Sequence, residues 1–307
     1  MSRRAFYLSI TFLLTALLSG SSYGGKQTLA DKTVTVSFDE GLKGPAREVL
    51  RIYPAIKGEL LKDLGWSTSF HPEIVLIKDS ASFRRAVGND LVTALAIPDK
   101  DLIVVDYSRM NVRPFTLGTT LKHELCHLEL HHHITRRTLP RWLDEGICQW
   151  VTGGLAEIVT DGSYPILREA ALSNRLINFE RLAERFPEEG RDFLLAYEES
   201  RSIVEYIKRE FGVSGVQSIL KYMAQDEDLE DAVQKSILIS VDELEKRWRL
   251  SITKRTLWFS YISDNLYEML FLCAAVISIY GFFVTLRRKR AYKDEDEGGN
   301  EGDEEKR

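Results

Sequence analysis

Short apolar or β-branched runs bounded by turn residues dominate the first third of the chain. They have the length and composition of strands, and they cover residues 33–38, 73–77, 92–97 and 102–105. Pro98 to Asp101 separates the last two runs, which predicts a hairpin. Between the first two runs, apolar residues recur at helical spacing from Pro45 to Leu64, and Gly65 follows as a helix terminator.

Helical spacing takes over in the second part of the chain. A short helix is expected over residues 80–87 with Ser80 as its cap, and a longer one from Pro114 to about His133. Pro140 begins the next helix, and the pattern from residue 165 to residue 250 contains no strand signal. The fold class is therefore α+β: a small N-terminal mixed sheet with helices, a helix at the junction, and an all-helical C-terminal subdomain.

The two ends of the chain have the patterns of export and membrane insertion. Arg3 and Arg4 precede an apolar run, and small and polar residues follow it, which predicts a signal peptide over residues 1–24. Residues 266–286 form an apolar segment long enough for a transmembrane helix. Arg287 to Arg290 follow at once, so the C-terminus is expected in the cytoplasm.

These ends divide the chain into predicted domains. A folded domain, residues 25–262, consists of a sheet subdomain (25–135) and a helical subdomain (136–262), and it faces the extracytoplasmic side. A charged tail, residues 287–307, follows the membrane helix, and it is expected to be disordered from Lys293 to Arg307.

The amino-acid composition and net charge say little about which molecules this protein binds. The chain has 307 residues, 44% of them hydrophobic and 28% charged, as in an ordinary globular protein. Its formal net charge of −5 gives no reason to expect nucleic acid as a partner. Oligomeric state is not indicated.

The chemistry is concentrated in residues 123–145. His123-Glu124-Leu125-Cys126-His127 places two histidines four residues apart, on one face of a helix, where both can bind one metal ion. A catalytic Zn²⁺ takes three protein ligands and leaves a position for water. Glu145, which lies 18 residues after His127, is the expected third ligand. Glu124 is the expected general base that takes a proton from the water.

His133 is an alternative third ligand, because it lies ten residues after His123, as in HExxHxxGxxH enzymes. That motif needs glycine at position 130 so that the chain can turn back, and this chain has Leu130. We therefore expect the helix to continue, with His131, His132 and His133 mainly solvated or at the rim.

Two further questions stay open at the sequence level. A metal-bound histidine usually donates its other N–H to an acceptor, and either Asp144 or Gln149 can serve. Cys126 and Cys148 occupy small-residue positions on the two ligand helices, where two buried thiols are favoured over a disulfide.

The segments HELCH, LPRWLDEGICQW and YEESRSIVEYIKREFG resemble those of gluzincins, the thermolysin and aminopeptidase-N-like zinc peptidases. The similarity is closest to bacterial peptidase MA-like domains and covers roughly residues 33–250. It implies hydrolysis of peptide or protein substrates, and a tyrosine that stabilises the oxyanion. Tyr197 matches best, while Tyr164, Tyr206 and Tyr222 are alternatives. It also implies an edge strand that pairs with substrate, for which residues 92–97 are the candidate.

Together these features predict a membrane-anchored, extracytoplasmic zinc metallopeptidase with a single C-terminal transmembrane helix. Two alternatives remain: a catalytically idle binding domain that keeps the fold, and a zinc hydrolase acting on a non-peptide amide.

Overall fold

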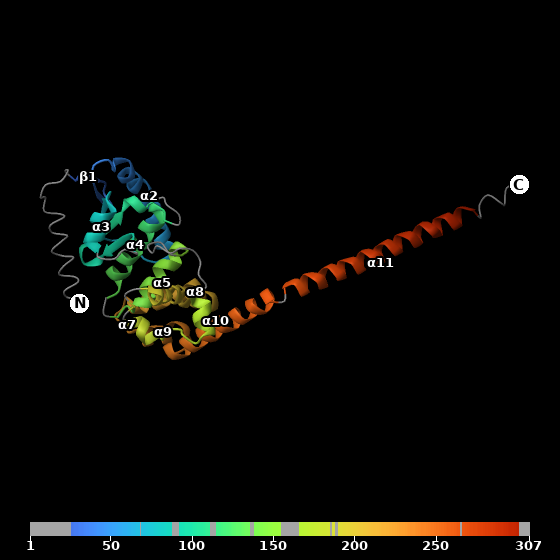
Figure 1. Ribbon diagram of the computed structural model, residues 1–307. Coiled ribbons are helices and arrows are strands. Elements are labelled where there is room, and N and C mark those ends of the chain that lie inside the picture. The colour runs from blue at the N-terminus through green and yellow to red at the C-terminus, as the bar shows by residue number, and fades with distance from the viewer. Residues whose placement is uncertain are drawn as a thin grey trace. The chain divides into compact units, whose positions relative to one another are not determined.

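The computed structural model describes residues 26–67, 69–87, 92–110, 115–135, 138–154, 166–184, 186–187, 190–264 and 266–300 (Figure 1). The expected signal peptide, residues 1–24, lies outside these ranges. The chain divides into two compact units, Met1–Leu250 and Ser251–Arg307.

The first unit begins with a five-stranded mixed sheet in the order β1-β2-β3-β5-β4. Its strands are β1 (Gln27–Ala30), β2 (Thr35–Phe38), β3 (Glu73–Ile77), β4 (Ala94–Ile97) and β5 (Leu102–Asp106). The three central strands are parallel, and β1 and β4 pair antiparallel at the two edges. The predicted hairpin is confirmed: β4 pairs with β5, with Ala94 opposite Val105 and Ile97 opposite Leu102.

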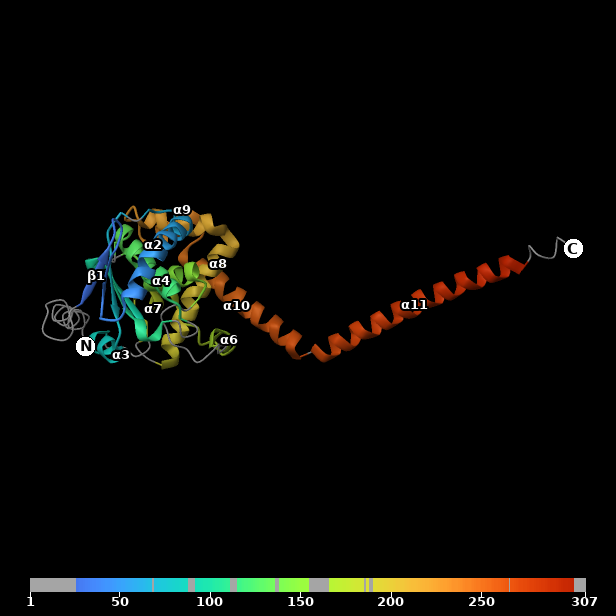
Figure 2. The ribbon, with the colours of Figure 1, turned by 90° about the horizontal axis from the view of Figure 1, so that it is seen from above.

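Helices cover both faces of this sheet. Successive residues of a strand point to opposite faces, and Val75, Ile77 and Val104 pack with Phe83 of α3 (Ser80–Val87). The other face is covered by α2 (Lys43–Leu64), which contacts β2, and by α4 (Leu117–His133), which contacts β4 and β5. Figure 2 shows α2 and α4 on the same side of the sheet.

The described part of residues 138–250 contains only helices, as predicted. They are α5 (Arg141–Thr152), α6 (Ile166–Leu172), α7 (Phe179–Glu184), α8 (Gly190–Met223), α9 (Leu229–Ile237) and the first part of α10 (Val241–Asp264). Helix α8 is interrupted at Gly212, whose φ of 76° is left-handed and suits glycine. Three buried aromatic rings in contact, those of Trp142, Phe179 and Trp248, hold α5, α7 and α10 together.

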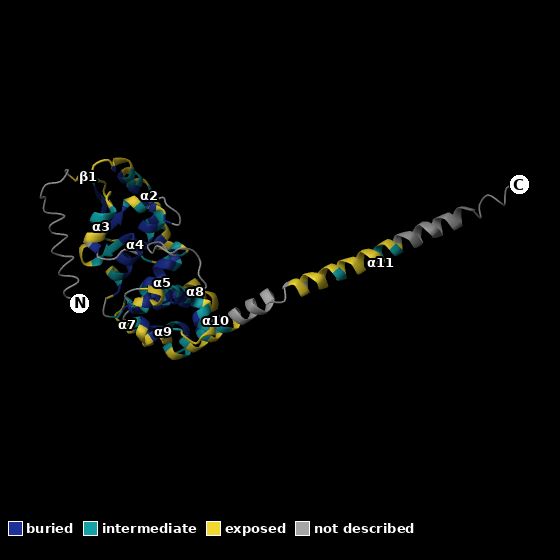
Figure 3. Cartoon of the chain, in the orientation of Figure 1, coloured by how far each residue is buried: buried dark blue, intermediate teal, exposed yellow. Residues whose placement is uncertain are grey.

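The second unit contains the end of α10 and the long helix α11 (Leu266–Asn300). Within α11, Leu270–Arg287 is long and apolar enough to cross a membrane. Its large apolar side chains are exposed, with Phe271 at 78% and Ile277 at 69%; in Figure 3 this stretch is mostly yellow.

Three sequence expectations need correction. Strand β1 had not been predicted, because its QTLA segment is short and mostly exposed and shows no apolar alternation. Ser80 is not the cap of α3: Asp79 accepts the amide of Ser82 at 2.8 Å, and the Ser80 hydroxyl donates to Asp106 instead. The tail was expected to be disordered from about residue 293, but α11 continues to Asn300, since extending an existing helix costs less than nucleating one.

Candidate metal centre

Three potential ligand atoms converge where α4 and α5 meet. The Nε2 atoms of His123 and His127 are 3.2 Å apart, and Glu145 Oε2 lies 4.0 Å from the first and 3.6 Å from the second. All three residues are buried. The histidines meet because they lie one turn apart on α4, whereas Glu145 is brought in by the packing of α5 against α4.

The spacing of these atoms suits a tetrahedral ion. Two atoms bound to one zinc at about 2.0–2.1 Å in tetrahedral geometry are separated by about 3.3 Å. The two histidine nitrogens, 3.2 Å apart, match that value, and the distances from them to Glu145 Oε2, 3.6 and 4.0 Å, are somewhat longer. Two imidazoles and one carboxylate are also the donor set that a catalytic zinc site uses. The residues present therefore fit a zinc ion.

Asp144 connects the cluster to a further histidine. His127 Nδ1 donates to Asp144 Oδ1 at 2.7 Å, and His131 Nε2 donates to Asp144 Oδ2 at 2.9 Å. The first bond fixes the ring of His127 so that Nε2 points to His123 and Glu145. A carboxylate that holds a ligand histidine in this way both orients the ring and raises its basicity.

These charges shift the pKa of both partners. Burial alone would lower the pKa of His127, but Asp144 and Glu145 outweigh it and hold the pKa well above its usual value. Burial would raise the pKa of Asp144, whereas His127 and His131 hold it well below its usual range. The carboxylate is therefore ionised throughout the neutral range.

A second group with suitable atoms, His127, Asp144 and Cys148, fits a metal less well. Its His127 and Asp144 already hydrogen-bond to each other. Burial and the neighbouring Cys126 raise the pKa of the Cys148 thiol well above its usual value, so it stays protonated at neutral pH. Both cysteines are buried and free, as favoured from the sequence.

The outer oxygen of Glu145 has two donors. The hydroxyl of Tyr197, on α8, donates to Oε1 at 3.2 Å, and Arg141 Nη2 approaches the same atom at 3.4 Å. Tyr197 is also tied to α5 through its carbonyl, which accepts from Gln149 Nε2 at 3.1 Å. Glu145 is thus oriented from the side away from the histidines.

A comparison with protein-family models matches residues 79–254 to the Peptidase MA superfamily. The match covers more than half of the chain and includes α4, α5 and α8. The chain belongs to the Peptidase MA superfamily. No curated protein matches the sequence. In this member of the superfamily, His123, His127 and Glu145 form a triad like the metal ligands of a metallopeptidase.

The rival ligand His133 lies elsewhere. Helix α4 runs on through Leu130 to His133, as predicted. The His133 ring stacks on Trp66 with a centroid distance of 4.6 Å, and its Nε2 lies 3.8 Å from Glu129. His132 packs beside Phe70. Neither residue joins the cluster.

The other sequence candidates also have defined places. Of the two possible acceptors for His127, Asp144 serves, while Gln149 binds the Tyr197 carbonyl. Tyr206 and Tyr222 contact the side chains of Arg209 and Lys235. Tyr164 lies outside the described residues. Glu124 is 1% exposed and follows His123 directly on α4.

The sequence reasoning missed two residues. His131 was expected to be mainly solvated or at the rim, with no partner named, but its side chain is only 14% exposed and is bonded to Asp144. Its position four residues after His127, on the same helical face, was an available signal. Arg141 was not considered, although it lies one turn before Glu145 and so shares its face of α5.

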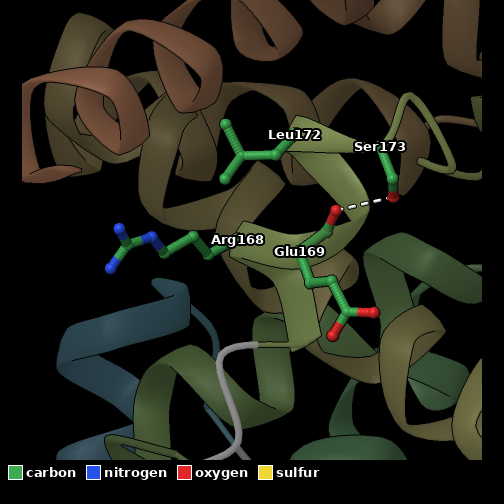
Figure 4. A pocket seen from close by; sticks show the side chains of 4 residues that line it. All are labelled: Arg168, Glu169, Leu172 and Ser173. Atoms are coloured by element: carbon green, nitrogen blue, oxygen red, sulfur yellow. Dashed lines mark hydrogen bonds between the residues drawn. The ribbon is translucent and has the colours of Figure 1, made fainter.

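A separate pocket on α6 does not contribute to this centre. It is lined by Arg168, Glu169, Leu172 and Ser173, and Figure 4 shows the Ser173 hydroxyl bonded to the backbone carbonyl of Glu169. The Glu169 carboxylate pairs with Arg175 and Arg191. These contacts tie α6 to its surroundings.

Proposed function

We propose that this protein is a membrane-anchored, extracytoplasmic zinc metallopeptidase that hydrolyses peptide bonds with water. The observation that carries the proposal is the cluster of His123 Nε2, His127 Nε2 and Glu145 Oε2, with separations of 3.2–4.0 Å, in a member of the Peptidase MA superfamily. A histidine-rich surface helix would not explain why all three side chains are buried and convergent.

In this proposal His123, His127 and Glu145 hold Zn²⁺, which when bound acidifies water and polarises a carbonyl group. Glu124 accepts a proton from the attacking water and returns it to the departing amine. Its place next to His123 and its burial support that role. Asp144 orients His127, and Tyr197 orients Glu145. The oxyanion role predicted for Tyr197 from the resemblance stays a prediction.

We assign β4 the task of holding the substrate backbone. Among the described strands it pairs on one side only, with β5, and it lies at the edge of the sheet next to α4. Extended peptides bind such edges by adding a strand. The small side chain of Ala96 is partly exposed and leaves room for a substrate side chain, whereas Ala94 is buried.

We further propose that α11 anchors the enzyme. Leu270–Arg287 has the length and composition of a span, and its exposed apolar side chains are consistent with lipid as their surroundings. The basic residues from Arg287 onward favour a cytoplasmic C-terminus. Protease treatment of sealed vesicles of both orientations tests this: a C-terminal tag cleaved only in inside-out vesicles supports it, and the reverse pattern contradicts it.

The function is tested on the full chain purified in detergent. Metal analysis should find about one zinc per chain, and a peptide library should be cleaved in a chelator-sensitive way that added zinc restores. A protein without zinc would contradict the proposal. Zinc without cleavage of any peptide would favour the idle binding domain, and cleavage of non-peptide amides alone would favour the other hydrolase.

A further inference from the structure

The donor expected to stabilise the oxyanion is turned away from solvent. Tyr197 is 3% exposed, and its hydroxyl donates to Glu145 Oε1. Its ring is fixed by Phe186 and Phe193 at centroid distances of 5.2 and 4.8 Å. To reach a substrate carbonyl, the hydroxyl would have to leave the carboxylate that it orients.

Arg141 approaches the same oxygen and, unlike Tyr197, is partly exposed. Its side chain is 43% exposed, whereas that of Glu145 is 8% exposed. The guanidinium lies 4.9 Å from the centre of the Phe186 ring, a cation–π contact that restrains its position. It therefore stands at the boundary between the buried cluster and solvent.

A guanidinium suits the charge that peptide hydrolysis creates. It is permanently cationic and has five N–H donors in a planar fork. One of them approaches Glu145 Oε1 at the long distance of 3.4 Å, and the side chain also hydrogen-bonds to the Tyr197 hydroxyl. These two contacts leave other N–H donors of the fork for a substrate oxygen. An accessible cation beside the ligand carboxylate is well placed to meet an oxygen that becomes negative.

We propose that Arg141 is a catalytic residue that donates to the carbonyl oxygen of the scissile peptide bond as negative charge develops on it. This assignment rests on the proposed peptidase function. When the bond from the water oxygen to the carbonyl carbon forms, the π pair moves to the carbonyl oxygen and a water proton moves to Glu124. When the C–N bond breaks, the pair returns to the carbonyl, and the amine nitrogen receives the proton. Arg141 stabilises the oxygen between these steps and exchanges no proton.

The test compares two inhibitors on the full chain with zinc bound. Both are built on the best-cleaved library peptide: a phosphonamidate, which has tetrahedral anionic oxygens at the scissile position, and a mercaptoacyl analogue, which binds the metal through sulfur. In Arg141→Gln, we expect phosphonamidate affinity and kcat to fall on the order of 10²- to 10³-fold, and mercaptoacyl affinity to change by less than about threefold. Arg141→Lys keeps the positive charge but lacks the planar set of donors, so its phosphonamidate affinity and kcat should lie between those of the wild type and Arg141→Gln.

Tyr197→Phe is the matched variant, because it removes the other donor to Glu145 Oε1. It should weaken the binding of both inhibitors alike, since it disturbs Glu145, the proposed metal ligand. A selective loss of phosphonamidate binding in Tyr197→Phe but not in Arg141→Gln would overturn the proposal.

Equal loss of both inhibitors in Arg141→Gln would also overturn it, by showing that Arg141 only positions Glu145. If Arg141→Gln lost activity only towards peptides with acidic side chains, the proposal would be overturned, and Arg141 would have a role in substrate specificity instead. Each of these outcomes leaves the peptidase function standing, whereas a wild-type protein that cleaves no peptide would contradict the function itself, and the role of Arg141 with it.

Discussion

A Cβ atom on Gly146 would lie 2.4 Å from the carbonyl oxygen of Ser200. Helices α5 and α8 therefore cross at a distance that only glycine permits. Gly146 follows Glu145, the third proposed metal ligand, and Ser200 lies one turn after Tyr197 on α8. The close crossing is thus what brings the Tyr197 hydroxyl to Glu145.

Gly146→Ala should separate the two helices. Because the clash is with backbone, we expect overpacking to cost about 1–3 kcal/mol in the free energy of unfolding, together with weaker zinc binding. Gly58→Ala is the matched control: a Cβ there meets nothing within 4 Å in helix α2, so this change should be neutral or stabilising. Thermal unfolding and zinc titration of both variants provide the measurement. Wild-type stability and zinc affinity in Gly146→Ala would contradict the prediction, by showing that α5 and α8 can move apart without loss.

Asp144→Asn should weaken zinc binding on the order of 10- to 100-fold, the usual effect of losing the acceptor that orients a ligand histidine. An amide cannot accept from both His127 and His131 as the carboxylate does. Competition with a chelator measures the affinity, and Asp192→Asn, an exposed aspartate on α8, is the control. Wild-type affinity in Asp144→Asn would rule out this orienting role.

Zinc affinity should rise with pH through neutrality. His127 must lose its proton to bind a metal, and its pKa in the metal-free protein is held well above the usual value near 6.5. A proton therefore competes with zinc at pH 7, and the affinity should increase about tenfold per pH unit until that pKa is passed. Chelator competition from pH 6 to 9 measures how steeply the zinc affinity changes with pH. An affinity that is flat above pH 6.5 would contradict the raised pKa.

The stability of the helical subdomain should fall as pH rises. Burial raises the pKa of Glu199 from 4.5 to about 8, against the effects of the Ile177 amide and Arg249. The folded state then binds a proton that the unfolded state has lost. This contribution is complete below pH 4.5 and is lost as pH rises towards 8, by up to about 1.4 kcal/mol per unit.

Glu199→Gln keeps an acceptor for the Ile177 amide and removes the titration. Its unfolding temperature should therefore exceed that of the wild type by more at pH 8 than at pH 5.5. Glu210→Gln, which changes an exposed glutamate of the same helix, should show no such trend. Unfolding temperatures of Glu199→Gln and the wild type that differ by the same amount at every pH would contradict the prediction.

Local patterns were sufficient for most of the fold. Strand β3 and helix α3 have the predicted bounds, because turn residues mark both of their ends. Leu130 correctly indicated that α4 continues to His133, since a turn there would need glycine. Strand β1 was missed because its stability comes from pairing with β2, which is a tertiary property.

Contacts between helices could not be read in the same way. Helical periodicity placed His123 and His127 together, but the choice of Asp144 over Gln149 depends on how α5 is rotated against α4. That rotation is set in part by Gly146 against Ser200, which lie 54 positions apart in the sequence. The exposure of Arg141 beside a buried ligand depends on the same packing.

The most direct measurement of the central claim is a comparison of Glu124→Gln with the wild-type enzyme. The amide keeps the shape of the side chain but cannot accept a proton from water. We predict that Glu124→Gln retains about one zinc per chain and loses peptide hydrolysis by on the order of 10²- to 10⁴-fold, while Glu129→Gln, the same change at a buried glutamate of the same helix, stays active. Hydrolysis at the wild-type rate by zinc-loaded Glu124→Gln would contradict the account.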